Sequence, residues 1–405
     1  MPTARTTAPL RRELQSALPE RPFSVTFWDG SSLPATNGGQ TAFHVRSPAA
    51  LAHILRAPGQ LGIGRAYVSG ALDVDDLEAA LRVVGTYQPP PLDRKTQAKL
   101  ALAAVRAVGP MRPPKVPDAE LKPQGRRHSI ERDKRSVRHH YDLSNDFFAL
   151  FLDESMTYSC AFFSLDGSSL EAAQSAKLAL TSGKLGLSAG ERVLDVGCGW
   201  GSFAIHCARE HGVSVTGITL SEPQAQRARQ RVADAGLSDK VEIRVMDYRE
   251  LGTDSYDAIA SIGMVEHVGA NQIDEYAATL ARILKPGGRL LNHGIARLRM
   301  GEPEAGPFSE RYVFPDAAPL HLSRIQLALE RAGFETDHVE GFREDYAETL
   351  RHWSRRLDEN AEQAERLVGI ERLRVFRLYL RAAGNGFATG FTSVYQVRCR
   401  KPLLA

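Results

Sequence analysis

The segment VLDVGCGWG, residues 193–201, is the most specific short stretch of this sequence. An apolar, β-branched run ends at Asp195, and the glycines that follow let the backbone turn tightly against a ligand. A helix is predicted to begin near Ser202, so the segment reads as strand, loop and helix. In the G-x-G-x-x-G pattern of dinucleotide-binding loops the third glycine would stand at 202, but here it arrives one residue early, at Gly201. The spacing therefore argues against a pyrophosphate site.

Outward from this segment, strand and helix patterns alternate along the chain. Strands are predicted at 191–197, 213–220, 241–247, 256–262 and 288–295. Helices are predicted at 175–187, 201–212, 222–237 and 276–288. This alternation predicts an α/β fold, with a mostly parallel sheet and helices on both faces. Sheets of this kind bind ligands beyond the carboxyl ends of their strands.

A carboxylate and an imidazole lie together at one predicted strand end. The apolar run YDAIASI (256–262) is followed by GMVEHVG (263–269), which places Glu266 and His267 just past the strand. Burying an unpaired charge is costly. We therefore expect the pair to face either water or a ligand that needs it.

Composition excludes several classes of protein. The chain has 405 residues, of which 43% are apolar and 24% charged, as is usual for a soluble globular protein. No apolar run approaches the ~20 residues of a membrane-spanning helix, and the first residues lack the apolar core of a secretory signal. The four cysteines show no paired spacing, which argues against a disulfide framework or a zinc site. We expect a cytoplasmic protein, and a net charge of +3 is too small to predict a nucleic-acid partner.

Proline-rich stretches divide the chain. We predict a small N-terminal α/β or helical domain at 1–88, a basic linker with one helix at 89–125, and a catalytic domain at 126–405. Basic residues greatly outnumber acidic ones between 94 and 138. This segment is either a solvated helix face and flexible linker or a patch that rests on anionic lipid, where each basic residue contributes ~1 kcal/mol.

An acidic residue two positions before G-x-G-x-G resembles the first motif of the class I S-adenosylmethionine-dependent methyltransferases, which have a Rossmann-like fold. Many such enzymes end the second strand with an acidic residue that holds the ribose hydroxyls. Here Thr219 takes that position. Either Glu222 or Gln224 must therefore bind the ribose hydroxyls, or the ribose is held differently. After the third strand, Asp247 and Tyr248 suit hydrogen bonding and stacking with adenine.

Several further stretches together resemble one family, the cyclopropane-fatty-acyl-phospholipid synthases and the related mycolic acid cyclopropane synthases. The matching stretches are HYDLSNDFFALFLDESMTYSCAFF (140–163), RVLDVGCGWGSF, GITLSEPQ, MDYREL, SIGMVEHVG, NHGIA, RYVFP, DYAETLRHW and YLRAAGNGF. The stretch GIGRAYVSGALDVDDL also resembles the additional N-terminal domain of the phospholipid-acting branch. The resemblance thus covers nearly the whole chain.

The resemblance implies a reaction at the cis double bond of a phospholipid acyl chain. The methyl group of S-adenosylmethionine passes to the alkene, a poor nucleophile that must be closely aligned with the sulfonium. The resulting carbocation requires a dry, apolar pocket with aromatic faces. A bound bicarbonate ion then removes a proton, and a cyclopropane ring closes.

The resemblance also implies the residues of the site. The catalytic group around bicarbonate comprises Cys160, Glu266, His293, the Ile295 backbone and Tyr346, with the Glu266 carboxylate accepting the proton of the ion. The cofactor-binding residues are Tyr158, Ser159, Asp195, Gly197, Cys198, Gly199, Gly201, Thr219, Leu220, Ser221, Gln224, Asp247, Tyr248 and Arg249. His267 carries no assigned role.

Simpler interpretations compete with these assignments. Cys160, His293 or Tyr346, taken singly, is more often a structural residue than a functional one. Cys160, Glu266 and His293 carry the donor types that zinc accepts, but they lie on distant segments without ligand-pair spacing, so we expect no metal. Family members often have a cysteine where this chain has Ala383, and we expect that thiol to be dispensable because the proposed base lies elsewhere.

Other functions remain open at this stage. The same methyl transfer could end in a methylene- or methyl-branched chain, and the fold could serve an inactive lipid-binding scaffold or a small-molecule methyltransferase. The expected partners are unsaturated phospholipid acyl chains and a membrane surface that the enzyme contacts peripherally. The sequence leaves a homodimer open.

Overall fold

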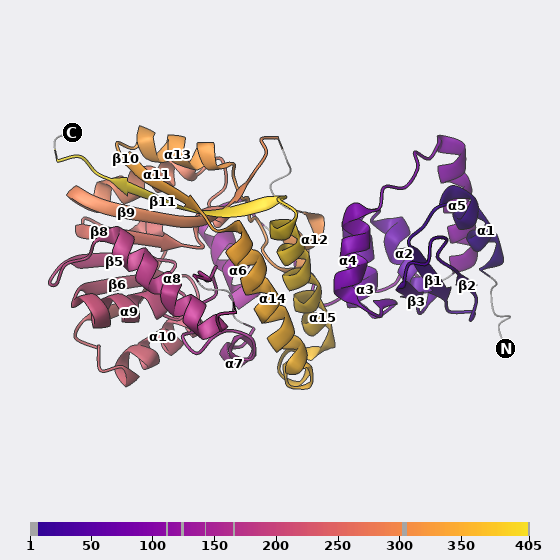
Figure 1. The fold of residues 1–405 in the computed structure, drawn as a ribbon, viewed down its shortest axis with the longest axis horizontal. Helices are drawn as coiled ribbons and strands as arrows, with labels where there is room; N and C mark the ends of the chain where they lie inside the picture. Colours follow the sequence, from indigo (N-terminus) through magenta and orange to yellow (C-terminus); the bar gives the residue numbers. More distant parts are fainter. Residues whose placement is uncertain are drawn as a thin grey trace. The chain divides into compact units, whose positions relative to one another are not determined.

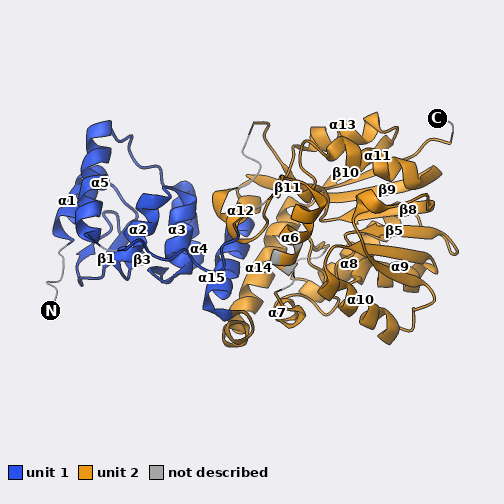
Figure 2. Cartoon of the chain, turned by 180° about the vertical axis from the view of Figure 1, so that it is seen from behind, with its two compact units in different colours: residues 1–121, 369–385 blue, residues 122–368, 386–405 orange. Residues whose placement is uncertain are grey.

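The structure of the protein is a computed structural model that describes residues 7–110, 112–122, 125–141, 143–164, 167–301 and 306–403. The chain forms two compact units, one of residues 1–121 with 369–385 and the other of residues 122–368 with 386–405 (Figure 2). Each unit has its own sheet and its own apolar core. None of the helices in the described ranges is both long and apolar enough to cross a membrane.

The N-terminal unit is built on a four-stranded sheet in the order β2-β1-β3-β4, in which only β1 and β3 are parallel (Figure 1). Its elements are α1 (Ala8–Ala17), β1 (Phe23–Phe27), β2 (Ser32–Leu33), β3 (Thr41–Val45), α2 (Pro48–Arg56), α3 (Gln60–Val68), β4 (Leu72–Val74), α4 (Leu77–Thr86) and α5 (Arg94–Val108). Helix α5 lies in the segment that we expected to be a linker. It buries Ala103, Ala104 and Ala107 in the core of this unit.

The C-terminal unit alternates helices and strands. Its elements are α6 (Ile130–Tyr141), α7 (Asn145–Ala149), α8 (Leu170–Leu185), β5 (Arg192–Val196), α9 (Ser202–His211), β6 (Ser214–Thr219), α10 (Glu222–Asp234), β7 (Val241–Val245), η1 (Tyr248–Glu250), β8 (Tyr256–Ile262), η2 (Val265–His267), α11 (Ile273–Ile283), β9 (Leu284–Arg297), α12 (Pro307–Tyr312), α13 (Leu322–Arg331), β10 (Glu335–Gly341), α14 (Arg343–Glu359) and β11 (Thr392–Arg400). Helix α15 (Ala361–Ala388) is interrupted at Gly369, whose φ of 77° is not helical. Its residues 369–385 belong to the N-terminal unit and its other residues to the C-terminal unit.

The large sheet has the strand order β10-β11-β9-β8-β5-β6-β7. Strands β5 to β9 are parallel to one another, and β11 is antiparallel to both of its neighbours. Because β5 is flanked by β6 on one side and β8 on the other, the chain reverses its direction of travel across the sheet at β5. That reversal marks the point where open α/β sheets bind ligands.

Both faces of the large sheet are covered by helices (Figure 1). Val193 of β5 belongs to a core cluster with α8, α9 and α10, whereas the next residue, Leu194, belongs to a cluster with α11 and α13. Successive strand residues point to opposite faces, so this division means that both faces are buried. The predicted α/β fold with a mostly parallel sheet and helices on both faces is confirmed.

One predicted boundary is wrong. The helix expected over 276–288 ends at Ile283, and β9 begins at once at Leu284. Pro286 lacks a backbone N–H and clashes with the preceding turn of a helix, so the helix cannot continue through it. The residues after Ile283 join the strand that pairs with both β8 and β11.

Candidate active site

The glycine loop after β5 adopts a conformation that only glycine accepts readily. Gly197, Gly199 and Gly201 have φ angles of 77°, 53° and 81°, in the left-handed region that disfavours other residues. A Cβ atom at Gly197 would lie 3.2 Å from the Met264 side chain. The backbone N–H of Gly197 donates to Ile218 O at the end of β6 (3.0 Å), which fixes the loop at the edge of the sheet.

A cavity opens at this edge. Most of the predicted cofactor residues line it, namely Tyr158, Ser159, Asp195, Gly197, Cys198, Gly199, Thr219, Leu220, Gln224, Asp247, Tyr248 and Arg249. Two predicted residues are placed otherwise. Gly201 precedes the first residue of α9, and the Ser221 hydroxyl accepts from the Gln224 N–H and caps α10.

The structure distinguishes between the two predicted ribose-binding candidates. Gln224 is buried and lines the cavity, and its Oε1 accepts a hydrogen bond of 2.9 Å from the Thr219 hydroxyl. Glu222 is exposed and forms an ion pair with Arg229 on the surface of α10. The amide of Gln224 is therefore the group that could serve a ribose in place of the usual carboxylate.

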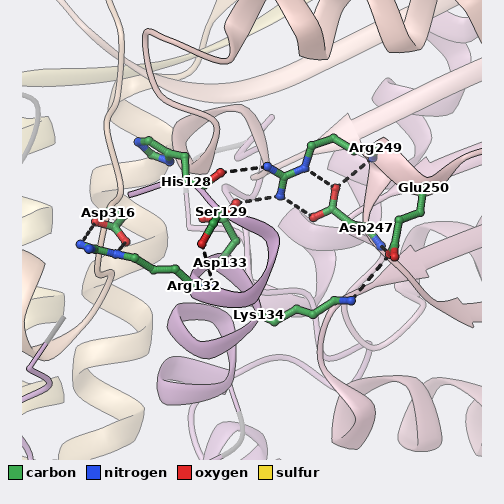
Figure 3. A network of polar contacts seen from close by, with 9 residues as sticks. All are labelled: His128, Ser129, Arg132, Asp133, Lys134, Asp247, Arg249, Glu250 and Asp316. Carbon is green, nitrogen blue, oxygen red and sulfur yellow. Dashed lines mark hydrogen bonds and ion pairs between the residues drawn. The ribbon is translucent and has the colours of Figure 1, made fainter. Parts of the chain in front are cut away.

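An ion-pair network closes the β7 side of the cavity (Figure 3). The Arg249 guanidinium donates to both carboxylate oxygens of Asp247 (2.7 Å each) and to Asp133 Oδ2 of α6 (2.8 Å). It also donates to His128 O (3.1 Å). Burial raises the pKa of Asp133 to about 6 despite this pairing. Arg249 thus joins the strand end that carries Asp247 to helix α6.

Two basic residues of α6 form ion pairs with acidic residues outside this helix. Arg132 forms a two-pronged ion pair with the buried Asp316, with both distances 2.6 Å, and Lys134 lies 3.7 Å from Glu250 (Figure 3). Both basic residues lie in the segment 94–138, which we interpreted as a solvated face or a lipid-binding patch. In the structure these two cations hold α6 against the cavity.

Glu266 is buried just beyond β8. Its carboxylate lies against two glycines: a Cβ atom at Gly294 would be 3.3 Å from Oε2, and one at Gly263 would be 3.9 Å from Oε1. Burial raises the pKa of Glu266 to about 7, while hydrogen bonds from its own N–H and that of Ile295 oppose this shift. Among the described residues, Oε2 has no hydrogen-bond partner.

His293 lies on the neighbouring strand β9, and its register partner on β8 is Ile262, just before Gly263. The ring Nδ1 is 3.1 Å from the amide nitrogen of Gln396, which can only donate, so the proton of the neutral imidazole resides on Nε2. Burial and the nearby ammonium groups of Lys177 and Lys184 lower the pKa of His293 to about 3. Within the described chain, Nε2 has no partner.

Phe342 connects the other two predicted catalytic residues to His293. Its ring stacks on the His293 ring, with centroids 6.2 Å apart, and its carbonyl lies 3.6 Å from Cys160 Sγ. The same carbonyl accepts from the Tyr346 N–H (3.0 Å). Burial raises the pKa of the Cys160 thiol well above its ordinary value, which keeps it protonated. The Tyr346 ring packs on Phe387, with centroids 4.5 Å apart.

The five predicted catalytic residues therefore come from adjoining elements at one edge of the sheet. None of the five lines the cofactor cavity, whereas Met264 and His267, on either side of Glu266, do line it. In the described part of the chain, no group of three or more His, Cys, Asp or Glu residues is arranged to hold a metal ion.

Sequence reasoning missed several residues that line the cavity. Asp133 and Ser136 come from α6, and Lys177 comes from α8. A signal for Lys177 was available, because it falls on the buried stripe of its helix between Leu170 and Leu185. No comparable signal placed α6 at the cavity, since only the folded chain brings Asp133 to Arg249.

Comparisons with known proteins agree with this geometry. Residues 128–397 match the family described as mycolic acid cyclopropane synthetase. A probable fatty acid methyltransferase from Pseudomonas putida is 36% identical over 387 residues, which cover 94% of this chain and 92% of that protein. The cyclopropane-fatty-acyl-phospholipid synthase of Escherichia coli strain K12 is 33% identical over 368 residues, covering 90% and 89%. The crystal structure of the mycolic acid cyclopropane synthase CmaA1 complexed with SAH and CTAB has a TM-score of 0.63 and 34% identity, covering 66% and 98%.

The fold, the glycine loop and these comparisons define a class I S-adenosylmethionine-dependent methyltransferase. The chain belongs to the mycolic acid cyclopropane synthetase family. The cavity suits the cofactor, because a side chain on the glycine loop would fill the cradle and because Asp195 Oδ2, buried in the lining, has no partner among the described residues.

Proposed function

We propose that the protein transfers the methyl group of S-adenosylmethionine to a cis double bond of a phospholipid acyl chain and closes a cyclopropane ring there. The observation that carries this proposal is the pair of buried, unmatched atoms at Glu266 Oε2, just beyond β8, and His293 Nε2, on the adjoining strand β9. One is an acceptor and the other a donor. A small oxyanion that bears a hydroxyl, such as bicarbonate, would satisfy both.

The π electrons of the alkene form a bond to the methyl carbon as its bond to sulfur breaks, which leaves a positive charge on the second alkene carbon. Loss of a proton from the added methyl group frees the C–H electron pair to form the third bond of the ring. Bicarbonate, when bound, would supply the base that takes this proton.

The residues of this chain would orient and activate that base. The Glu266 carboxylate accepts the hydroxyl of the ion and so increases the electron density on the remaining oxygens, while His293 Nε2–H suits an oxygen atom of the ion. The Ile295 N–H donates to the Glu266 carboxylate and so holds that side chain in place. Since the pKa of His293 is lowered to about 3, the imidazole stays neutral and keeps its single donor. The Cys160 thiol, also protonated, adds no negative charge.

Aromatic side chains suit the positive charge on the acyl chain. Tyr158 and Trp353 lie with their ring centroids 5.0 Å apart, and Trp353 meets the Tyr346 ring edge-on at 6.1 Å. Ring faces attract cations, and a packed aromatic wall excludes the water that would capture the carbocation. We assign the acyl chain to this wall.

A second outcome of the same chemistry is favoured by one relative. The Pseudomonas putida protein is described as a probable fatty acid methyltransferase, which suits a product that keeps the added carbon as a methylene or methyl branch. For a methylene branch, a hydrogen on the methylated carbon first moves with its electron pair to the cationic carbon, and the added methyl group then loses a proton. For a methyl-branched alkene, a chain carbon next to the cation loses the proton instead. The residues that shape the pocket around the cation would decide between the two products.

We also infer that the protein binds membrane surfaces peripherally. Four basic residues on α5, Arg94, Lys95, Lys99 and Arg106, are exposed together with Leu102 and Val105, whose exposed fractions are 50% and 53%. Cations with apolar side chains between them suit an anionic lipid surface.

Product analysis tests the proposed function. The protein is incubated with cis-unsaturated phospholipid vesicles and methyl-labelled S-adenosylmethionine, and the acyl chains are examined by proton NMR. We expect label in the chains and ring hydrogens upfield of all other lipid signals. Alkene hydrogens of a methylene branch in place of ring signals would support the second outcome, and unlabelled chains would refute both.

A further inference from the structure

The cavity holds a buried lysine that the assignments above leave unused. Lys177 of α8 is 2% exposed and lines the cavity, and its Nζ donates to the Ser159 hydroxyl at 3.0 Å. An ammonium group has three hydrogens to donate. Within the described residues, Ser159 is the one hydrogen-bond acceptor that Nζ reaches.

The buried carboxylates near Lys177 do not pair with it directly. Asp153 already accepts from Ser155 and from the Thr157 N–H. Asp195 lines the same cavity, but its Oδ2 has no hydrogen-bond partner in the described chain. Burying a cation and an anion at one cavity without contact is costly. A bound molecule with a negative group beside Lys177 and a positive group beside Asp195 would offset this free-energy cost.

The strand order separates Asp195, whose charge interacts with that of Lys177, from the site predicted for adenine. Asp247, which the resemblance assigns to adenine, follows β7, and Asp195 is the second-last residue of β5, two strands away. Neighbouring strands lie ~4.8 Å apart, so the two sites are separated by roughly 10 Å along the cavity. An elongated ligand with adenine over β7 would bring its other end to Lys177 and Asp195.

We infer that Lys177 binds the carboxylate of the methionine end of S-adenosylmethionine. Ser159 orients the ammonium group of Lys177, and Asp195 faces the α-ammonium group of the ligand. The charges then alternate along the contact: ammonium, carboxylate, ammonium, carboxylate. Each buried charge then lies beside an opposite charge, which lowers the electrostatic cost of burying it. Lys177 is in this view a positioning residue for the cofactor.

The test compares two ligands that differ only in the carboxylate, S-adenosylhomocysteine and its decarboxylated form, by calorimetry. On the unaltered protein, S-adenosylhomocysteine is expected to bind at least ~10-fold more tightly, the scale of a hydrogen bond to a charged group. In Lys177→Met that preference is expected to fall below about 2-fold, within the error of such comparisons. Binding of the decarboxylated ligand to the variant reports an intact cavity.

Lys184→Met is the matched control. It removes another largely buried ammonium from the same helix, but one that pairs with Glu340 and Gln396 and does not line the cavity. It is expected to keep the full preference for the carboxylate. The inference is overturned if the unaltered protein shows no preference, or if Lys177→Met retains it. Because both ligands lack the methyl group and no lipid is present, this result is independent of whether a ring is formed.

Discussion

At the scale of single residues, Glu266 and His267 are neighbours in sequence with different surroundings. Burial raises the pKa of Glu266 to about 7 and lowers that of His267 to about 4. The Glu266 carboxylate lies against Gly263 and Gly294, whereas His267 lines the cofactor cavity and meets the Phe314 ring edge-on. The sequence predicted that this pair would face water or a ligand. It could not predict that the two side chains separate, because this depends on the short helix η2.

Changing Glu266 to Gln tests its part in proton removal. The amide keeps the size of the side chain but accepts the hydroxyl of the anion less strongly and adds no charge. We expect turnover to fall at least ~100-fold, the scale of a lost acid–base element, while calorimetry shows nearly unchanged affinity for S-adenosylhomocysteine. Glu222→Gln, on the exposed start of α10, should leave turnover unaltered. Full turnover in the Glu266 variant would refute the anion site.

The raised pKa of Glu266 also predicts a pH dependence. Below a pKa of about 7 the side chain is protonated and cannot accept the hydroxyl of the anion. We therefore expect kcat/KM for lipid, at saturating S-adenosylmethionine, to fall as the pH is lowered from 8 to 6. The pKa values of His267 and His293, about 4 and 3, lie below this range.

Asp195 requires a control, because burial raises its pKa to about 7 as well. The pH profile of the residual activity of Glu266→Gln separates the two carboxylates. If kcat/KM of the variant does not change between pH 8 and 6, Glu266 is the group that titrates in the unaltered protein. If kcat/KM of the variant still falls as in the unaltered protein, another group titrates and the prediction is contradicted.

At the scale of elements, local patterns predicted the strands of the sheet well. Strands β5 to β9 were all predicted, since buried parallel strands appear as apolar, β-branched runs. The contacts of α6 (Ile130–Tyr141) could not be predicted in this way. Its charged sequence, IERDKRSVRHH, suggests a solvated helix. Its position depends on Asp316 and Arg249, which lie far away in the sequence.

Changing Arg132 to Met tests how α6 is held. The variant leaves the 3% exposed Asp316 without its closest cation, and breaking a buried pair of this kind is strongly destabilising. We expect amide hydrogens of α6 to exchange at least ~10-fold faster, corresponding to a loss of ~1.4 kcal/mol, with little change in β5. Lys134→Met removes the longer, more exposed contact to Glu250 and should have little effect. Equal exchange rates in the two variants would contradict this assignment.

At the scale of the whole molecule, sequence patterns could not reveal that residues 369–385 cluster with the N-terminal residues. Arg374 donates to the carbonyls of Tyr67 and Leu72, contacts between segments about 300 residues apart that no local pattern encodes. The predicted domain boundary at 125 lies close to the division between the units at 121 and 122. Removing residues 1–88 would leave α5 and residues 369–385 without their core, so charge reversal is a better test of that unit than truncation.

Reversing two charges on α5 tests the inferred membrane contact. Lys95→Glu combined with Lys99→Glu changes exposed residues without touching the buried alanines of the helix. At ~1 kcal/mol for each basic residue, binding to anionic vesicles should fall at least ~10-fold in co-sedimentation. Affinity for S-adenosylhomocysteine should not change. Lys115→Glu, outside α5, serves as the control, and undiminished vesicle binding by the double variant would argue against α5 as the contact.

Turnover as a function of bicarbonate concentration tests the anion site itself. The claim is that Glu266 and His293 hold a small oxyanion that takes the proton of the added methyl group. In buffer freed of carbon dioxide, we expect methyl transfer to lipid by the unaltered protein to fall and to recover saturably as bicarbonate is added, while Glu266→Gln stays at its low rate throughout. Full turnover in the absence of bicarbonate would contradict the claim.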